Sequence, residues 1–120
     1  MMNVEQLRDL AVKTLDEMKG IDIVTIDVRS LTSITDFMII CTASSNRHLK
    51  TLADYVSIKA KELGATYVQI EGEKENEWVL VDLGDVVVHI MLATIRSFYR
   101  LEDLWEPIKE LREQKNHSAD

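Results

Sequence analysis

The feature that most constrains the fold is a continuous apolar run followed at once by a helix start. Residues 37–42 are almost entirely apolar, which is typical of a strand covered on both faces. Residues 44–46 (Ser-Ser-Asn) have helix N-cap chemistry, and an apolar stripe then follows through residues 46–63. Gly64 is placed to end that helix, and residues 66–71 alternate as a strand. This order predicts a βαβ unit with a right-handed crossover between parallel strands.

Further elements are predicted on both sides of that unit. Residues 3–19 form an amphipathic helix, and Gly20 is placed to end it in a left-handed turn. Residues 21–28 alternate as a strand that suits a position near a sheet edge. Residues 78–83 and 85–92 are two apolar strands joined by a tight turn, which is most simply a hairpin.

The whole pattern predicts an α/β fold with the order α-β-β-α-β-β-β-α. One domain is expected over residues 1–114, built on a mixed five-stranded sheet with packed helices. Within it, residues 95–105 fit short helical turns, and Pro107 is suited to begin a last helix. Residues 115–120 are expected to be a frayed polar tail.

Charge and chain composition limit the classes of partner. The chain has 21 acidic against 14 basic residues, a formal net charge of −7, and its bases do not cluster strongly. Direct nucleic-acid binding is therefore not expected, and a basic protein surface is the better match. The apolar runs are too short to span a membrane, and the N-terminus does not resemble a signal peptide. We expect a soluble cytoplasmic protein whose lone Cys41 is a buried apolar residue.

Two groups of polar residues are candidates for a catalytic or ligand-binding site. Residues 44–48 could hold a nucleotide phosphate at a helix start, but an ordinary N-cap explains them more simply. Asp82 and Asp85 could hold magnesium, although their spacing across a bend does not bring them to one face. Asp85 is expected to satisfy turn amides and Asp82 to face solvent or a partner, while His89 reads as a hydrogen-bonded core residue. No catalytic residue, metal or cofactor is predicted.

Two tryptophans are candidates for a protein interface. Trp78 begins a strand beside charged residues and is predicted to be partly exposed, with Leu80 and Asp82 on the same strand face. Trp105 lies among Leu104 and other apolar residues and is predicted to be core.

Four sequence blocks, taken in their order and spacing, resemble the ribosomal silencing factor family, also called Iojap-like. The blocks are residues 34–40 (ITDFMII), residues 42–48 (TASSNRH), Glu71-Gly72 followed by residues 78–89 (WVLVDLGDVVVH), and residues 96–105 (RSFYRLEDLW). The resemblance covers roughly residues 4–106. The family usually has glycine where Ala43 stands and often proline near Ala93.

The resemblance implies a fold related to the nucleotidyltransferases, without their activity. It also implies binding to the large ribosomal subunit through a basic ribosomal protein, the fourteenth of that subunit. Bound there, the protein would block joining to the small subunit and lower translation when nutrients run short. Family members are often homodimers. By analogy, Trp78, Leu80 and Asp82 are the predicted partner-binding residues.

Two alternatives stay open from the sequence. One is a nucleotidyltransferase-like, nucleotide-binding enzyme that uses Ser44 and Ser45 with Asp82 and Asp85. The other is direct binding of ribosomal RNA by basic residues at the start of the second helix, namely Arg47, His48 and Lys50.

Overall fold

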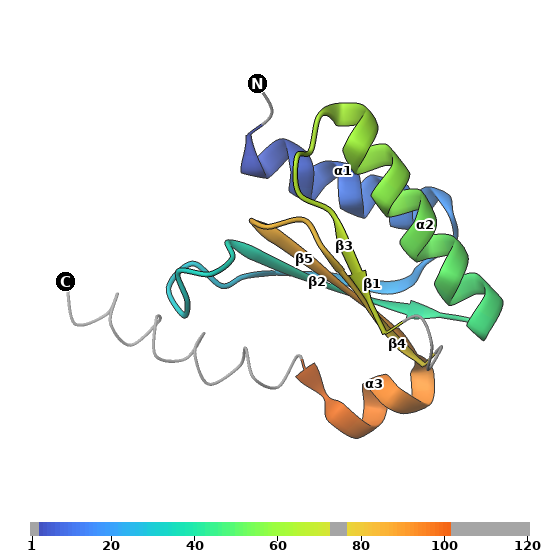
Figure 1. The fold of residues 1–120 in the computed structure, drawn as a ribbon. Coiled ribbons are helices and arrows are strands. Elements are labelled where there is room, and N and C mark those ends of the chain that lie inside the picture. The colour runs from blue at the N-terminus through green and yellow to red at the C-terminus, as the bar shows by residue number, and fades with distance from the viewer. Residues whose placement is uncertain (1–2, 73–76, 102–120) are drawn as a thin grey trace, which may run out of the picture.

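Five strands form one mixed sheet with helices on both sides (Figure 1). The computed structural model describes residues 3–72 and 77–101. Its elements are α1 (Val4–Glu17), β1 (Ile21–Asp27), β2 (Phe37–Ala43), α2 (Asn46–Leu63), β3 (Gln69–Glu71), β4 (Trp78–Asp82), β5 (Val86–Leu92) and α3 (Ala93–Tyr99). The predicted α/β class, the mixed five-stranded sheet and this order of elements are confirmed.

The spatial order of the strands is β1-β2-β5-β4-β3. Among the strands of residues 3–72 and 77–101, only β2 and β5 are adjacent and parallel. The other neighbours are antiparallel, including the predicted β4–β5 hairpin. Strands β2 and β3 run in the same direction, as the βαβ prediction requires, but β5 and β4 lie between them. Strand β3 is also shorter than predicted, because only Gln69–Glu71 pair with β4.

One face of the sheet is covered by α1 and α2 (Figure 1). The predicted apolar stripe of α2 is buried there, and Val79 and Val81 of β4 belong to the same core cluster. Cys41 is fully buried in this cluster, as predicted. The main core therefore lies between the sheet and the two long helices.

The opposite face carries a smaller cluster of Ile26, Val28, Ile40 and Met91. Helix α3 lies on this side (Figure 1). Residues paired across neighbouring strands share a face, so the strand register orders this surface into rows. One row consists of Val24, Ile40, His89, Leu80 and Glu71. The neighbouring row, on the same face, consists of Ile26, Met38, Val87, Asp82 and Gln69.

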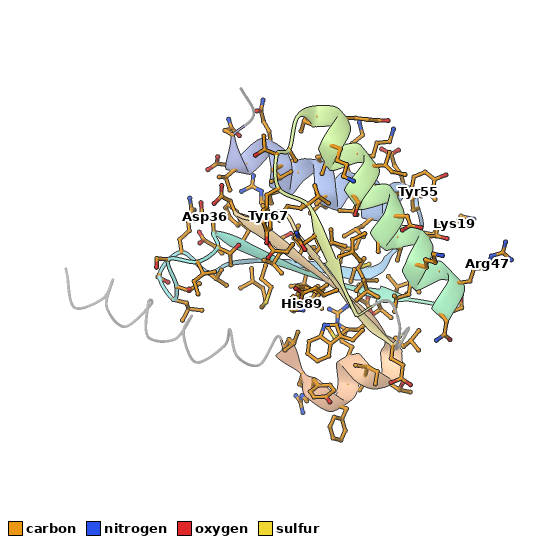
Figure 2. The ribbon with its side chains drawn as sticks, in the orientation of Figure 1. Lys19, Asp36, Arg47, Tyr55, Tyr67 and His89 are labelled. Carbon is orange, nitrogen blue, oxygen red and sulfur yellow. The ribbon has the colours of Figure 1, made fainter. Side chains whose placement is uncertain are left out.

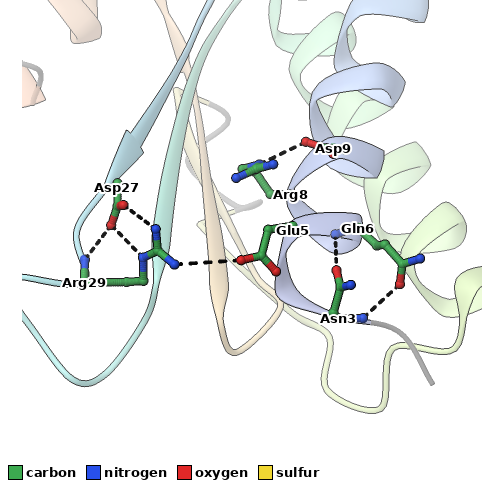
Figure 3. A network of polar contacts seen from close by, with 7 residues as sticks. All are labelled: Asn3, Glu5, Gln6, Arg8, Asp9, Asp27 and Arg29. Atoms are coloured by element: carbon green, nitrogen blue, oxygen red, sulfur yellow. Dashed lines mark hydrogen bonds and ion pairs between the residues drawn. The ribbon is translucent and has the colours of Figure 1, made fainter.

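The first helix is fixed at its N-terminal end by polar contacts (Figure 3). Asn3 and Gln6 form a reciprocal capping box, with hydrogen bonds of 2.8 and 2.9 Å. Arg29, just beyond β1, pairs with Asp27 at 2.6 Å and with Glu5 of α1 at 3.8 Å. These contacts join the start of α1 to the end of β1.

The two predicted glycine caps have different outcomes. Gly64 ends α2 in the left-handed region with φ 109°, as predicted. The prediction for Gly20 is wrong, because the left-handed residue after α1 is Lys19, with φ 65°. Gly20 serves a close approach instead, since a Cβ there would collide with Sγ of Cys41 and the carbonyl oxygen of Leu15.

The C-terminal predictions fall partly outside the described residues. Helix α3 and Leu101 match part of the predicted turns at 95–105. The predictions for Trp105, for a helix starting at Pro107 and for a tail at 115–120 lie outside the described residues.

Candidate functional site

Trp78 lies on the sheet face opposite α1 and α2, half-buried as predicted. Its indole Nε1–H donates to Nδ1 of His89 over 3.0 Å. The two rings are 5.8 Å apart and tilted by 49°. His89 lies in β5 directly opposite Leu80 of β4, so its side chain is on the same sheet face as Trp78. The predicted hydrogen bonding of His89 is confirmed, but the residue is only partly buried rather than part of the core.

The histidine is held in its neutral form. Burial lowers the pKa of His89 from its ordinary value of 6.5 to about 4. An indole N–H can only donate, so Nδ1 accepts and Nε2 carries the ring proton. The polar atom of Trp78 is thus satisfied inside the protein, and the tryptophan has only carbon atoms to offer a partner.

Helix α3 holds the other side of Trp78. The ring of Tyr99 lies 5.0 Å from that of Trp78, and Phe98 stacks edge-on against Tyr99 at 5.1 Å. Phe98 is 79% exposed and Tyr99 is 53% exposed. Aromatic carbon is therefore available to solvent beside Trp78, which is unusual unless another surface covers it.

A groove of about 450 Å³ runs between the edge of the sheet and α3. We call it the Trp78 groove. Its lining residues are Glu71, Gly72, Glu77, Trp78, Leu80, Ile95 and Tyr99. Apolar side chains supply most of the lining, and two exposed acids, Glu71 and Glu77, stand among them. This combination suits a partner that presents an apolar contact next to positive charge.

Gly72 shapes one wall of the groove. Its φ of 90° lies in the region that favours glycine, and a Cβ there would collide with the carbonyl oxygen of Trp78. The chain leaving β3 can therefore pass directly over the main chain of Trp78. This explains why a glycine follows Glu71.

The three predicted partner-binding residues lie on one face, but they differ in setting. Trp78 and Leu80 both line the groove, whereas Asp82 lies outside it. Oδ1 of Asp82 accepts the Gly84 amide at 2.8 Å and so stabilises the β4–β5 turn. The prediction had given the turn amides to Asp85, whose main-chain oxygen instead accepts the amides of Asp36 and Phe37. An Asp side chain readily accepts a hydrogen bond from the amide two residues ahead, so Asp82 rather than Asp85 satisfies the turn amide of Gly84.

The constellation required by the enzyme alternative does not assemble. Ser44 and Ser45 follow the carboxyl end of β2, which is level with the end of β5 at Leu92. Asp82 and Asp85 flank the turn before β5 begins. The two pairs are therefore separated by the length of β5, roughly 20 Å. In the part of the chain that the structure describes, no three His, Cys, Asp or Glu side chains could share a metal ion.

Residues 44–48 make the N-cap that was the simpler expectation. Ser45 Oγ accepts the His48 amide at 3.0 Å. Nδ1 of His48 accepts the Ser44 amide at 2.9 Å, and its Nε2 donates to the carbonyl oxygen of Met18 at 2.8 Å. His48 thus ties the end of α1 to the start of α2. Arg47 is exposed and points away from the body of the molecule (Figure 2), and RNA contact by Arg47, His48 and Lys50 stays a prediction.

Sequence reasoning missed part of the groove. Residues 95–105 were predicted only as short helical turns, so the sequence did not place Ile95 and Tyr99 beside Trp78, and it assigned no role to Glu77. The available signal was the pair of adjacent aromatics at 98–99, which cannot both face inward from one short helix.

Over residues 3–72 and 77–101, no helix combines the length and apolar character needed to cross a membrane.

Comparison with known proteins gives consistent results. A family model described as "Ribosomal silencing factor during starvation" matches residues 2–120. The ribosomal silencing factor RsfS of Chromobacterium violaceum is 46% identical over 104 residues, which are 87% of this chain and 85% of that protein. The maize "Protein Iojap, chloroplastic" is 41% identical over 96 residues, 78% of this chain and 40% of that protein.

A mouse relative carries a more specific name. "Mitochondrial assembly of ribosomal large subunit protein 1" is 36% identical over 100 residues, 81% of this chain and 44% of that protein. Among solved structures, one from Chromobacterium violaceum has 46% identity and a TM-score of 0.84, with 88% of each chain covered. One from Bacillus halodurans has 34% identity and a TM-score of 0.75, with 84% of this chain and 94% of that one covered.

Proposed function

The chain belongs to the ribosomal silencing factor family, and on that premise we propose that it binds the large ribosomal subunit and blocks joining of the small subunit. The partner on the large subunit is the basic fourteenth protein, as the family resemblance implies. The consequence is lower translation when nutrients are limited. The name of the mouse relative, which refers to the ribosomal large subunit, supports the choice of subunit.

We propose that the Trp78 groove contacts the ribosomal protein. The observation that supports this most directly is a partly exposed tryptophan held in a fixed position. Trp78 is held by His89 on one side and Tyr99 on the other, so little freedom remains to be lost on binding. Leu80 adds an apolar surface beside it. Rigid tryptophans in such settings commonly supply much of the binding energy of a protein interface. Asp82, on the same face, is proposed to contact the edge of the partner.

Charge supports a basic partner. Glu71 and Glu77 line the groove, and the chain as a whole carries a formal net charge of −7. A negative field of this kind speeds encounter with a positive surface and disfavours contact with bare phosphate. The expected binding is therefore to ribosomal protein, with acids steering the approach and the apolar lining fixing the final position.

The proposed mechanism needs no turnover. A bound protein that covers the face used by the small subunit prevents joining simply by occupying space. The separation of Ser44 and Ser45 from Asp82 and Asp85 removes the arrangement on which the enzyme alternative depended. The proposal also places the protein in the cytoplasm, as the sequence predicted. Because family members are often homodimers, we propose that two copies of this chain can share the same contact face.

A sedimentation experiment with purified large subunits tests the proposal. Wild type should pellet with the subunits, and Leu80→Lys should lose at least tenfold in affinity, because it places a charge in the apolar lining and repels a basic partner. Leu63→Lys is the matched control. Leu63 is 44% exposed at the end of α2, on the other side of the sheet, and this variant should bind like wild type.

Circular dichroism of both variants establishes that they are folded. If wild type does not pellet with large subunits, the function is wrong. If folded Leu80→Lys binds as tightly as wild type, the groove is not the contact. Sedimentation of the free protein at several concentrations tests the homodimer separately.

A further inference from the structure

A second and larger groove lies on the other side of α3. It has a volume of about 1300 Å³, and we call it the Arg96 groove. Its polar lining includes Asp22, Thr42, Ser44, Ser45, Arg96 and Arg100. The ribosome-binding proposal does not use these residues. Ile95 and Tyr99 face the Trp78 groove, whereas Arg96 and Arg100 face this one, so α3 separates the two.

The Arg96 groove lies where α/β sheets commonly bind small molecules. Strands β2 and β5 are adjacent and parallel, and their carboxyl ends meet at the Ala43–Leu92 pair. Both residues line the groove. In sheets of this kind the crevice outside the carboxyl ends of parallel strands is open because each chain turns away into a helix. The position alone identifies no ligand, so the chemistry of the lining decides what could bind.

Arg96 provides a positive charge that is already in place. Its guanidinium donates to the main-chain oxygen of Asp22 at 2.6 Å and to Oγ1 of Thr42 at 3.0 Å. These bonds fix the side chain against β1 and β2, so its conformational freedom is restricted before any ligand arrives. Arg100 lies one helical turn further along, on the same side of α3. Among the described lining residues, Asp22 is the one acid beside these two arginines.

Hydroxyl groups of Thr42, Ser44 and Ser45 also line the groove. Thr42 accepts from Arg96 through Oγ1, and Ser45 accepts the His48 amide through Oγ, so each hydroxyl keeps its own proton to donate. Guanidinium and hydroxyl donors together match a phosphate group, whose several oxygens can accept from different directions. A carboxylate would use fewer of these donors.

One wall of the groove is apolar. Ile21 is 42% exposed, and Val24 and Leu92 line the groove beside it. A phosphate alone would leave this wall and most of the volume unused, whereas a sugar and base attached to it could cover both. We propose that the Arg96 groove binds a nucleoside phosphate, with Arg96 and Arg100 holding the phosphate. The groove binds this ligand without transferring its phosphate, since Asp82 and Asp85 lie at the far end of β5.

The test is a titration of the isotope-labelled full-length protein by NMR, with AMP, ATP, inorganic phosphate and an RNA oligonucleotide in separate arms. AMP or ATP should produce saturable shifts of the Ser44, Ser45 and Arg96 amides, and phosphate should act on the same amides more weakly. Arg100→Gln should weaken nucleotide binding about tenfold, because it removes one charge-assisted contact. Arg96→Gln should weaken it further.

Arg47→Gln is the control, because it removes the same charge from α2 at an exposed site outside the groove lining. It should bind nucleotide like wild type. The proposal is overturned if no nucleotide gives saturable shifts at millimolar concentration. It is also overturned if folded Arg100→Gln binds normally, or if only an RNA oligonucleotide, and neither nucleotide, acts on these amides. Ribosome binding is measured separately, so failure here leaves the proposed function standing.

Discussion

The indole N–H of Trp78 donates to Nδ1 of His89 over 3.0 Å, from the first residue of β4 to the middle of β5. This bond joins the proposed docking surface to the centre of the sheet. It orients the tryptophan ring and leaves its carbon atoms towards the groove. It also requires His89 to stay neutral, which burial ensures by lowering the histidine pKa to about 4.

Trp78→Phe tests the value of that bond. Phenylalanine keeps an aromatic ring in the groove but leaves Nδ1 of the half-buried His89 without its N–H donor. We expect a loss of about 1–3 kcal/mol in the free energy of unfolding, measured by urea denaturation. Tyr67→Phe, at a residue that is 49% exposed, should change stability by much less. Equal stability of Trp78→Phe and wild type would show that the bond contributes nothing net.

The lowered pKa of the partly buried His89 predicts a specific pH dependence. The pKa of His89 falls from 6.5 to about 4 on folding, so between those values the unfolded chain binds a proton that the folded chain does not. Stability is therefore fully present above pH 6.5 and declines as the pH falls towards 4, by up to about 3 kcal/mol from this group. His89→Asn keeps an acceptor for Trp78 and cannot titrate. Its stability should depend less steeply on pH than that of wild type, and identical slopes would contradict the assignment.

Gly72→Ala should disturb the groove through the main chain. The added Cβ meets the carbonyl oxygen of Trp78, and the φ of 90° is strained for alanine. We expect a loss of about 1–3 kcal/mol in thermal or urea unfolding and a shifted Trp78 indole signal in NMR. Gly84→Ala is a control for φ alone, since φ is 85° there and a Cβ would meet nothing. A loss no greater than that of the control would mean that the close contact is unimportant.

The thiol of Cys41 should be unreactive in the native protein. The residue is fully buried, and burial raises its pKa to about 11, so almost no thiolate forms at pH 8. A thiol reagent such as Ellman's should label it only after unfolding in guanidinium. Rapid labelling of native protein at pH 8 would show that the core around Gly20 and Cys41 opens readily.

Much of the fold could be predicted because the local signals agree with the tertiary structure. The run at 37–42 is buried in β2, and Ser45 and Gly64 bound α2 as their chemistry requires. The prediction that Gly20 ends α1 in the left-handed conformation was wrong, although a glycine directly after a helix usually has that role. Here Lys19 takes that conformation, and packing against Cys41 is what excludes a side chain at Gly20. Such a contact lies between residues distant in sequence and leaves no periodic signal.

The site was predicted less completely for a related reason. Strand alternation places Trp78, Leu80 and Asp82 on one face, and the structure agrees. It cannot reveal that α3 brings Tyr99 to Trp78, or that Glu71 becomes Leu80's neighbour through β3. Nor can it assign the Gly84 amide to Asp82 rather than to Asp85. Each of these depends on how two elements meet, and one sequence does not contain that information in any local pattern.

Reversal of charge in the groove tests the steering part of the proposal. Glu71→Lys with Glu77→Lys should slow association with large subunits at low salt, because two acids that face a basic partner become bases. Glu17→Lys with Glu62→Lys makes the same change in net charge on α1 and α2 and should slow association much less. Association rates can be followed by surface plasmon resonance with immobilised subunits. Equal slowing by both double variants would assign the effect to net charge rather than to the groove.

Subunit joining is the most direct measure of the central claim. Purified large subunits are incubated with the protein, small subunits are added, and the mixture is separated on a sucrose gradient. Wild type should reduce the joined-ribosome peak as its concentration rises, Leu63→Lys should do the same, and Leu80→Lys should leave the peak unchanged. Full joining while wild type co-sediments with the joined ribosome would contradict the account, because the protein would then bind without occluding the subunit face.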